Sequence, residues 1–198
     1  MVAARLDPTP QKARALALLL SHAERSRAAR FRFDRERRRF IVARAQLREL
    51  LAERLDVPPE SIGFVYAREG KPALAERFAR SGWRFNLSHC DELVLYAFSR
   101  EREVGVDVEA IRPVDEADAI GEHFFAPGER CAFRSLEREE RNTGFLRLWT
   151  RKEALAKALG DGLAVPLERL DASAPPCGWS IESFSPEPGF IGALAVQE

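Results

Sequence analysis

The sequence predicts an α+β protein made of two similar lobes, with a cleft between them. Segments with helical residue patterns are followed by segments with strand-like patterns, and this order occurs twice, on either side of about residue 100. A chain of 198 residues is long enough for two small lobes, and its two halves carry opposite local charge. We therefore expect one lobe over residues 1–102 and a second, pseudo-duplicated lobe over residues 103–198.

The first half is expected to be mainly helical and then to change to strands. Its residue pattern favours helices over residues 11–21, 23–33 and 35–55. Val57-Pro58-Pro59 ends the last helix, because a residue before proline is disfavoured in helical conformation. Apolar and aromatic runs favour strands over residues 62–66, 83–87 and 93–99. Gly70-Lys71-Pro72 has the composition of a turn.

The second half opens with a strand over residues 104–109, whose residues alternate between two faces. Three valines share one face, and Asp107 and Glu109 share the other. Helical patterns then return over residues 117–124, 127–136 and 142–160. Two strands close the chain, over residues 179–184 and 190–196.

The formal net charge is zero, but it hides two oppositely charged segments. Residues 24–48 hold ten arginines against three acidic residues, whereas residues 101–129 hold nine acidic residues against two arginines. The zero total argues against a dedicated nucleic-acid-binding protein. The asymmetry favours a polyanionic ligand on one half and a cation on the other.

The sequence lacks the signals that are typical of several common classes of protein. The three cysteines are widely spaced and form no CxxC pair, which argues against a disulfide framework or a structural zinc site. The longest apolar stretch, residues 15–20, is too short to span a membrane, and the first residues lack signal-peptide order. Neither a Walker A motif nor GxGxxG is present. We expect a cytoplasmic protein that binds neither membrane nor nucleic acid.

Two acidic positions suggest a metal site. The Cα atoms of Asp107 and Glu109 should lie roughly 6.5–7 Å apart, because the two residues are two positions apart on a strand. Both side chains leave the same strand face, so both carboxylates can bind one cation. Magnesium prefers oxygen ligands and often combines protein carboxylates with substrate phosphates. The alternative is a solvated strand face whose charges discourage edge pairing.

A second candidate lies in the last long helix, where Glu153 and Lys157 share a face. The alternative is an ordinary stabilising pair, since Glu-to-Lys spacing of this kind and the capping pattern Thr150-x-x-Glu153 are both frequent. A third candidate is FNLSH at residues 85–89, which offers a hydroxyl, an imidazole and backbone amides to phosphate oxygens. Ser88 and His89 point to opposite faces of a strand, so a Ser-His nucleophile pair is disfavoured.

Together these motifs resemble the 4′-phosphopantetheinyl transferase superfamily, in particular the pseudo-dimeric type typified by the surfactin-synthetase activator. The resemblance is carried by GVDVE at 105–109 and WTRKEALAK at 149–157, preceded by GKP at 70–72 and FNLSH at 85–89. It extends from about residue 21 to residue 171. It implies an active site in the cleft between the lobes of a monomer.

The resemblance implies transfer of the 4′-phosphopantetheine group of coenzyme A to a serine of an apo acyl or peptidyl carrier protein, leaving adenosine 3′,5′-bisphosphate. It implies that Asp107, Glu109 and Glu153 hold Mg²⁺, with Mn²⁺ as an alternative. Glu153 is the implied base, acting directly or through water. Lys157 and Lys152 are the implied catalytic lysines, with Lys157 beside the departing phosphate.

The resemblance also implies how coenzyme A lies across the cleft. Lys71 and Pro72 are implied beside the adenine, and the phosphates are implied near Arg27, Arg39, Ser88, His89 and Lys157. Glu24 departs from the pattern, since a basic residue is expected there. Phe124, Phe125 and Phe133 are our expected carrier-docking surface, with burial in the core as the alternative. A non-catalytic module that binds coenzyme A or a carrier protein is the alternative function.

Overall fold

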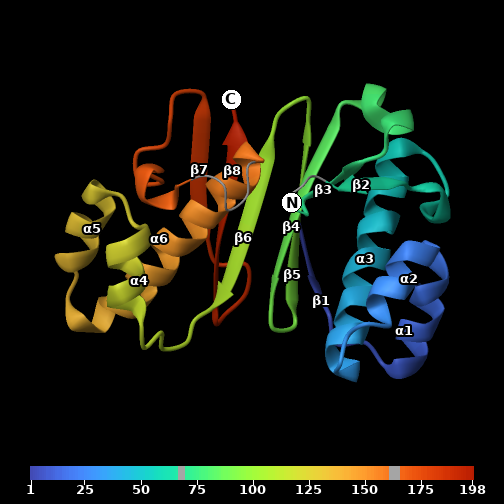
Figure 1. Ribbon diagram of the computed structural model, residues 1–198, viewed down its shortest axis with the longest axis horizontal. Helices are drawn as coiled ribbons and strands as arrows, with labels where there is room; N and C mark the ends of the chain where they lie inside the picture. Colours follow the sequence, from blue (N-terminus) through green and yellow to red (C-terminus); the bar gives the residue numbers. More distant parts are fainter. Residues whose placement is uncertain (67–69, 161–165) are drawn as a thin grey trace.

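The computed structural model describes residues 1–66, 70–160 and 166–198. Two three-stranded sheets stand next to each other in the middle of the molecule, and helices lie on the outer side of each (Figure 1). Residues up to 100 build one sheet with its helices, and residues from 104 build the other. None of the helices in these described ranges is long and apolar enough to cross a membrane.

The first half contains an edge strand, three helices, a small hairpin and two further strands. The helices are α1 (Pro10–Leu16), α2 (His22–Ala28) and α3 (Asp34–Leu55), with 3-10 turns at Ala17–Leu19, Pro59–Ser61 and Glu76–Ser81. The strands are β1 (Val2–Arg5), β2 (Phe64–Tyr66), β3 (Pro72–Leu74), β4 (Trp83–Cys90) and β5 (Leu93–Arg100). The main sheet has the antiparallel order β1-β5-β4, and β2 pairs with β3 in a separate hairpin.

Helix α3 covers the first sheet because its apolar side chains face the strands. Leu47 and Leu51 of α3 pack with Val94 and Tyr96 of β5 in the core of this half. The Tyr96 hydroxyl donates a hydrogen bond to the Ala43 carbonyl at 2.9 Å, which satisfies its polar end inside the core. The helix is therefore held in register on its sheet.

The second half has the same kinds of element in a similar order. Its helices are α4 (Ala117–Phe124), α5 (Pro127–Arg134) and α6 (Arg138–Leu159), with a 3-10 turn at Leu167–Arg169. Its strands are β6 (Val104–Ala110), β7 (Trp179–Phe184) and β8 (Phe190–Gln197), in the antiparallel order β6-β8-β7.

Helix α6 crosses β6 at very close range, and Gly105 makes this possible. A Cβ atom at Gly105 would lie 2.0 Å from the Ala154 carbonyl oxygen and 2.5 Å from the Ala158 nitrogen. Any larger residue at Gly105 would push the helix away from the strand. This crossing brings Glu153 and Lys157 of α6 toward the carboxylates of β6.

The two halves meet along β4 and β6, which lie side by side in Figure 1. A buried apolar cluster there combines Leu93 and Leu95 with Val104, Val106 and Val108. Burial of apolar surface from both sheets fixes the halves against each other. The polar residues of β4 and β6 are thereby held at fixed separations.

The predicted α+β class is confirmed, and most predicted elements are found. The predicted helix over residues 11–21 was wrong in its end, because Ser21 caps the next helix: its hydroxyl accepts from the Glu24 amide, and Glu24 accepts from the Ser21 amide. Strand β4 is longer than predicted and includes Ser88 and His89. Pro72, predicted in a turn, begins β3.

Candidate functional site

A pocket of about 280 Å³ lies between the two halves. The first half contributes Lys71 and Pro72, together with Asn86 of β4. Helix α6 contributes Glu153 and Lys157 from the opposite side. The fold thus brings together four side chains that the sequence singled out in segments far apart in the chain. A pocket at the junction of two structural units is a common place for a ligand site.

Lys71 is held at the rim of this pocket by groups from the second half. Its ammonium lies 3.6 Å from the Glu103 carboxylate and 3.5 Å from the Ala158 carbonyl oxygen. Burial lowers the pKa of Lys71, and the charge of Glu103 partly opposes this. Lys71 therefore presents a partly desolvated cation beside Pro72.

Asp107 is the centre of the polar network next to the pocket. Its Oδ1 accepts hydrogen bonds from Ser88 Oγ at 2.8 Å and from Lys157 Nζ at 2.6 Å. Lys157 Nζ also lies 3.0 Å from Ser88 Oγ, which closes a triangle of polar groups. Asp107 is 4% exposed, and its Oδ2 has no hydrogen-bond partner among the residues described. A buried carboxylate oxygen without a partner is costly unless a ligand satisfies it.

Burial and neighbouring negative charge raise the pKa of Glu109 and of Glu153. Burial and the charge of Asp107 raise the pKa of Glu109 above its ordinary value. Burial likewise raises the pKa of Glu153, with the charges of Asp107 and Glu109 adding to the rise and Lys157 opposing it. Mutual repulsion of this kind is relieved when a cation binds between the groups.

The arrangement has the donors for a hard cation but does not hold them as a closed cluster. Among the described residues, no three His, Cys, Asp or Glu side chains are placed close enough to hold a metal ion. Lys157 instead satisfies one oxygen of Asp107. The unpartnered Asp107 Oδ2 and the raised proton affinities of Glu109 and Glu153 nevertheless fit a divalent ion with oxygen ligands.

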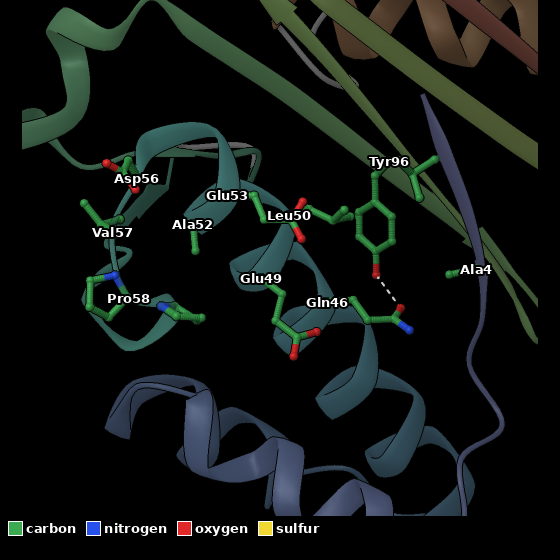
Figure 2. A pocket seen from close by; sticks show the side chains of 12 residues that line it. Ala4, Gln46, Glu49, Leu50, Ala52, Glu53, Asp56, Val57, Pro58 and Tyr96 are labelled. Carbon is green, nitrogen blue, oxygen red and sulfur yellow. Dashed lines mark hydrogen bonds between the residues drawn. The ribbon is translucent and has the colours of Figure 1, made fainter.

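A different and larger groove, of about 770 Å³, lies beside α3 (Figure 2). It is lined by β1, by Tyr96 and by Glu49 and Glu53 of α3. A hollow of about 830 Å³ beside α4 and the start of α6 is larger still, so volume alone does not identify the site. Neither of these two hollows holds any of the residues predicted to carry chemistry, so the smaller pocket is the better candidate.

Comparisons with known proteins identify the family of the chain. A family model described as "4′-phosphopantetheinyl transferase, N-terminal" matches residues 4–101, and one described as "4′-phosphopantetheinyl transferase superfamily" matches residues 103–188. The chain is 39% identical over 200 residues to the 4′-phosphopantetheinyl transferase HetI of Nostoc sp., covering 96% of this chain and 84% of that protein. The chain belongs to the 4′-phosphopantetheinyl transferase superfamily. The predicted family and the predicted enzyme class, a transferase, are confirmed.

Other relatives of this transferase match it over different lengths. A putative 4′-phosphopantetheinyl transferase of Synechocystis sp. is 40% identical over 152 residues, which cover 77% of this chain and 61% of that protein. The 4′-phosphopantetheinyl transferase ffp of Bacillus subtilis is 27% identical over 191 residues, covering 89% and 82%.

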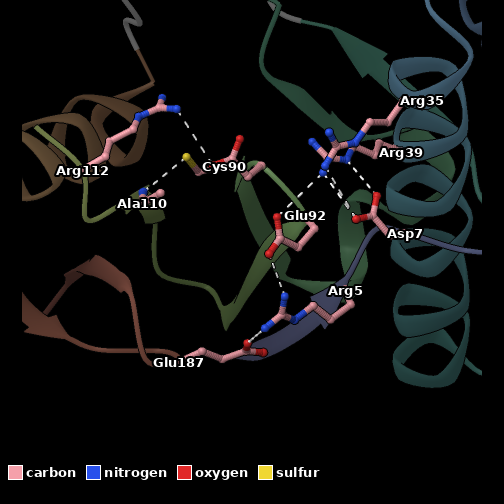
Figure 3. Close-up of polar contacts among 10 residues, drawn as sticks. Arg5, Asp7, Arg35, Arg39, Cys90, Glu92, Ala110, Arg112 and Glu187 are labelled. Carbon is pink, nitrogen blue, oxygen red and sulfur yellow. Dashed lines mark hydrogen bonds and ion pairs between the residues drawn. The ribbon is translucent and has the colours of Figure 1, made fainter. Parts of the chain in front are cut away.

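Of the residues predicted to contact the phosphates, Ser88 and His89 lie on β4 and Arg39 lies on α3. His89 is exposed on the face of β4 opposite Ser88; partial burial lowers its pKa, and the charges of Lys157 and Arg39 lower it further. Arg39 binds Asp7 through two nitrogens, at 3.1 and 3.5 Å, and lies 3.8 Å from Glu92 (Figure 3). Arg39 is thus held by carboxylates and does not line the pocket.

Arg27 lies apart from the pocket. It is exposed on α2 and lines a separate hollow of about 490 Å³, together with Arg30, Arg77 and Tyr66. Its guanidinium lies 5.4 Å from the centre of the Phe40 ring. The fold does not bring Arg27 to the other predicted site residues.

The structure places Lys152, a predicted catalytic residue, in the core rather than in the pocket. Lys152 is 0% exposed, and its ammonium binds Glu129 at 2.6 Å, the Leu167 carbonyl at 2.9 Å and the Leu170 carbonyl. These three acceptors use all three ammonium donors. Successive helix residues point about 100° apart, so Lys152 faces the core while Glu153 faces the pocket.

Two other expectations also change. Phe125 and Phe133 are buried and pack against Phe145, tilted in one case and edge-on in the other, so they are core residues rather than a docking surface. Phe124 is only partly buried. Glu24, noted as a departure from the family pattern, is a buried partner of Arg48. The departure therefore has a structural role.

The sequence reasoning missed two residues that touch the site. Glu103 pairs with Lys71 at the pocket rim, and the Cys90 thiol contacts Glu109. The alternation of β4 carries a signal for Cys90, because it lies two residues beyond Ser88 and so shares its face. Glu103 lies in a charged turn and has no comparable sequence signal.

Proposed function

We propose that this transferase moves the 4′-phosphopantetheine group of coenzyme A onto a serine hydroxyl of an apo acyl or peptidyl carrier protein and releases adenosine 3′,5′-bisphosphate. The observation that carries this proposal is the pocket between the halves, where Lys71 and Pro72 meet Glu153 and Lys157. Relatives named 4′-phosphopantetheinyl transferase support the same reaction.

Coenzyme A would lie across the junction of the halves. Lys71 and Pro72 would contact the adenine, and Ser88, His89 and Lys157 would face the phosphates. Arg39 would join them by exchanging a carboxylate partner for a phosphate. Phosphate oxygens accept strong hydrogen bonds from such donors. Arg27 would contribute only if the nucleotide end extended into the hollow beside α2.

The metal proposal rests on the carboxylates of β6 and α6. Asp107, Glu109 and Glu153 would hold Mg²⁺, or Mn²⁺ in its place. A bound divalent ion neutralises charge on the pyrophosphate oxygens during transfer. The unpartnered oxygen of Asp107 supports this assignment.

The chain's own side chains suit the proton and charge movements of the reaction. The new bond joins the carrier serine oxygen to phosphorus, and the bond to the departing adenosine 3′,5′-bisphosphate breaks. Glu153, with its raised pKa, is a suitable acceptor for the serine proton, directly or through water. Lys157 donates to Asp107 and Ser88 and would donate to the departing phosphate as its charge grows.

We further propose that residues 1–102 and 103–198 are similar lobes of a cytoplasmic monomer. The matching strand orders β1-β5-β4 and β6-β8-β7 support the duplication, as do helices of 22 residues in equivalent places, α3 and α6. The three free cysteines are compatible with a reducing compartment.

Intact-protein mass spectrometry of an apo carrier protein tests the reaction. The carrier is incubated with the full chain, coenzyme A and Mg²⁺, with and without a chelator. We expect a gain of one phosphopantetheine group that the chelator abolishes. Coenzyme A binding without any gain, across fatty-acid, polyketide and peptide carriers, would instead favour a non-catalytic binding module. A gain that survives the chelator would overturn the metal proposal alone.

A further inference from the structure

Alternate side chains of β4 are bonded to β6 across the junction of the two halves. Asn86 Oδ1 accepts a hydrogen bond from the Val106 amide at 3.0 Å. Two residues on, Ser88 donates to Asp107. The next residue on the same face of β4 is Cys90. One half of the chain thus supplies the groups that hold the acidic strand of the other.

Cys90 is bonded to β6 on two sides. Its Sγ lies 3.4 Å from Glu109 Oε2, and it accepts a hydrogen bond from the Ala110 amide at 3.3 Å. Cys90 is 8% exposed, so these contacts are shielded from water. In the described part of the chain, the Cys90 thiol is the one side chain that hydrogen-bonds Glu109.

We propose that Cys90 is a positioning residue for Glu109, and that its thiol orients the Glu109 carboxylate toward the cation of the reaction site. This inference rests on the proposed function and adds a residue to it. Groups that hydrogen-bond a metal ligand fix its orientation and change the affinity of the site. The Ala110 amide fixes the thiol, and the thiol in turn fixes Glu109 Oε2, which leaves Oε1 free to bind.

Mn²⁺ binding tests the inference without depending on activity. The full chain is titrated with Mn²⁺ in the absence of coenzyme A, and free Mn²⁺ is followed by electron paramagnetic resonance. We expect Cys90→Ala to weaken Mn²⁺ binding by about tenfold, the lower end for loss of an outer-shell partner. Cys90→Ser keeps a donor and should regain most of the affinity. Cys131→Ala, at an exposed free cysteine, is the control and should bind as the parent does.

The kinetic counterpart separates positioning from general packing. Cys90→Ala should raise the Mg²⁺ concentration for half-maximal transfer, while kcat at saturating Mg²⁺ and the melting temperature change little. In a Glu109→Gln background, Cys90→Ala should have no further effect on Mn²⁺ affinity, because the carboxylate that the thiol orients has been removed. If Cys90→Ala alone is poorly folded, Cys90→Val replaces it, because valine fills the space of the thiol and has no donor.

The outcomes are distinguishable. Equal Mn²⁺ affinity in the parent, Cys90→Ala and Cys90→Ser would overturn the positioning role and leave the proposed function standing. Loss of affinity in both variants, with no rescue by serine, would show a packing role and overturn it too. If the parent chain itself binds no Mn²⁺, the proposed metal site and this inference fall together.

Discussion

Helices α3 and α6 are anchored in the same way in their two halves. Each has 22 residues, and the fifteenth residue of each is a buried cation, Arg48 in α3 and Lys152 in α6. Arg48 binds Glu24 at 2.6 Å and two carbonyls of the segment after α3. Lys152 binds Glu129 at 2.6 Å and two carbonyls of the segment after α6. The two helices are therefore anchored by equivalent side chains.

The residues that follow the buried cation line different hollows in the two helices. Residues 16 and 20 of α6 are Glu153 and Lys157, which line the pocket between the halves. The same places in α3 hold Glu49 and Glu53, which line the larger groove in Figure 2.

The strands beside these helices differ as well. The groove beside α3 is lined from its edge strand by Val2 and Ala4, whereas β6 carries Asp107 and Glu109 beside the pocket. The pocket also receives Lys71 from the other half, and the groove has only its own half for walls. The comparison teaches that a long helix packed on a sheet is not enough for a site of this kind. The pocket also has carboxylates on the adjacent strand, and a lysine and further lining residues from the other half.

The largest contrast is expected at position 16 of the two helices. Glu153→Gln removes the proposed base and should lower kcat for transfer by about 10²–10⁴-fold. Glu49→Gln, its counterpart in α3, should leave kcat within about twofold, because the groove lacks the other groups of the site. Both are measured by the mass-spectrometric assay in time course. A comparable loss in Glu49→Gln would mean that the groove takes part in transfer.

Position 20 offers a second contrast. Lys157→Met removes the donor to Asp107 and Ser88, and transfer should fall by about 10²–10³-fold in kcat. Glu53→Gln is the matched control in α3 and should be close to the parent. If the loss in Lys157→Met appeared in the KM for coenzyme A with kcat unchanged, Lys157 would be a ground-state binder rather than a group that acts on the departing phosphate.

The buried cations test the shared scaffold. Lys152→Met leaves the buried Glu129 without its cation, and it should lower the free energy of unfolding by about 3–5 kcal/mol. Arg48→Met should cost less, because Glu24 keeps a contact with Arg44 at 3.5 Å. Urea denaturation measures this loss. The Lys152→Met chain that remains folded should keep near-parent kcat, since Lys152 is not among the described residues that line the pocket between the halves. If Lys152→Met lost transfer activity while its stability stayed close to that of the parent, Lys152 would have a catalytic role.

These residues also show how far the sequence alone could lead. Asp107 and Glu109 were predictable as a pair because strand residues two apart share a face. Glu153 and Lys157 were predictable because helix residues four apart share a face. Both are local rules, and both were enough to place residues on a common surface.

Lys152 could not be placed by such rules. Its direction depends on Glu129, a residue of another helix, and on carbonyls that follow α6. Lysine is rarely buried, so its motif position next to Glu153 gave no sign that its side chain lies in the core. The long strands and helices were predictable from pattern, whereas the break at Ser21 depended on a reciprocal cap with Glu24.

The smallest effect is expected at the start of α3, where the two helices also differ. The sixth residue of α3 is Arg39, which binds Asp7, and the sixth residue of α6 is Thr143. The hydrogen bond from Arg39 lowers the pKa of Asp7 below its ordinary value of 3.8. Asp7 is therefore expected to stabilise the fold above that value, and the contribution is lost as pH falls through the lowered pKa.

Because the Asp7 side chain is 50% exposed, water and salt screen this contribution. Asp7→Asn should lower the free energy of unfolding by less than about 1 kcal/mol at neutral pH. Urea denaturation of both proteins should show the difference shrinking at pH values below 3.8, where the aspartate of the parent becomes protonated too. It should also shrink at high salt. A difference that stays constant with pH and salt would mean that Asp7 acts through packing. The ion pair at the start of α3 would then add no stability, and the charge difference between Arg39 of α3 and Thr143 of α6 would have no effect on the fold.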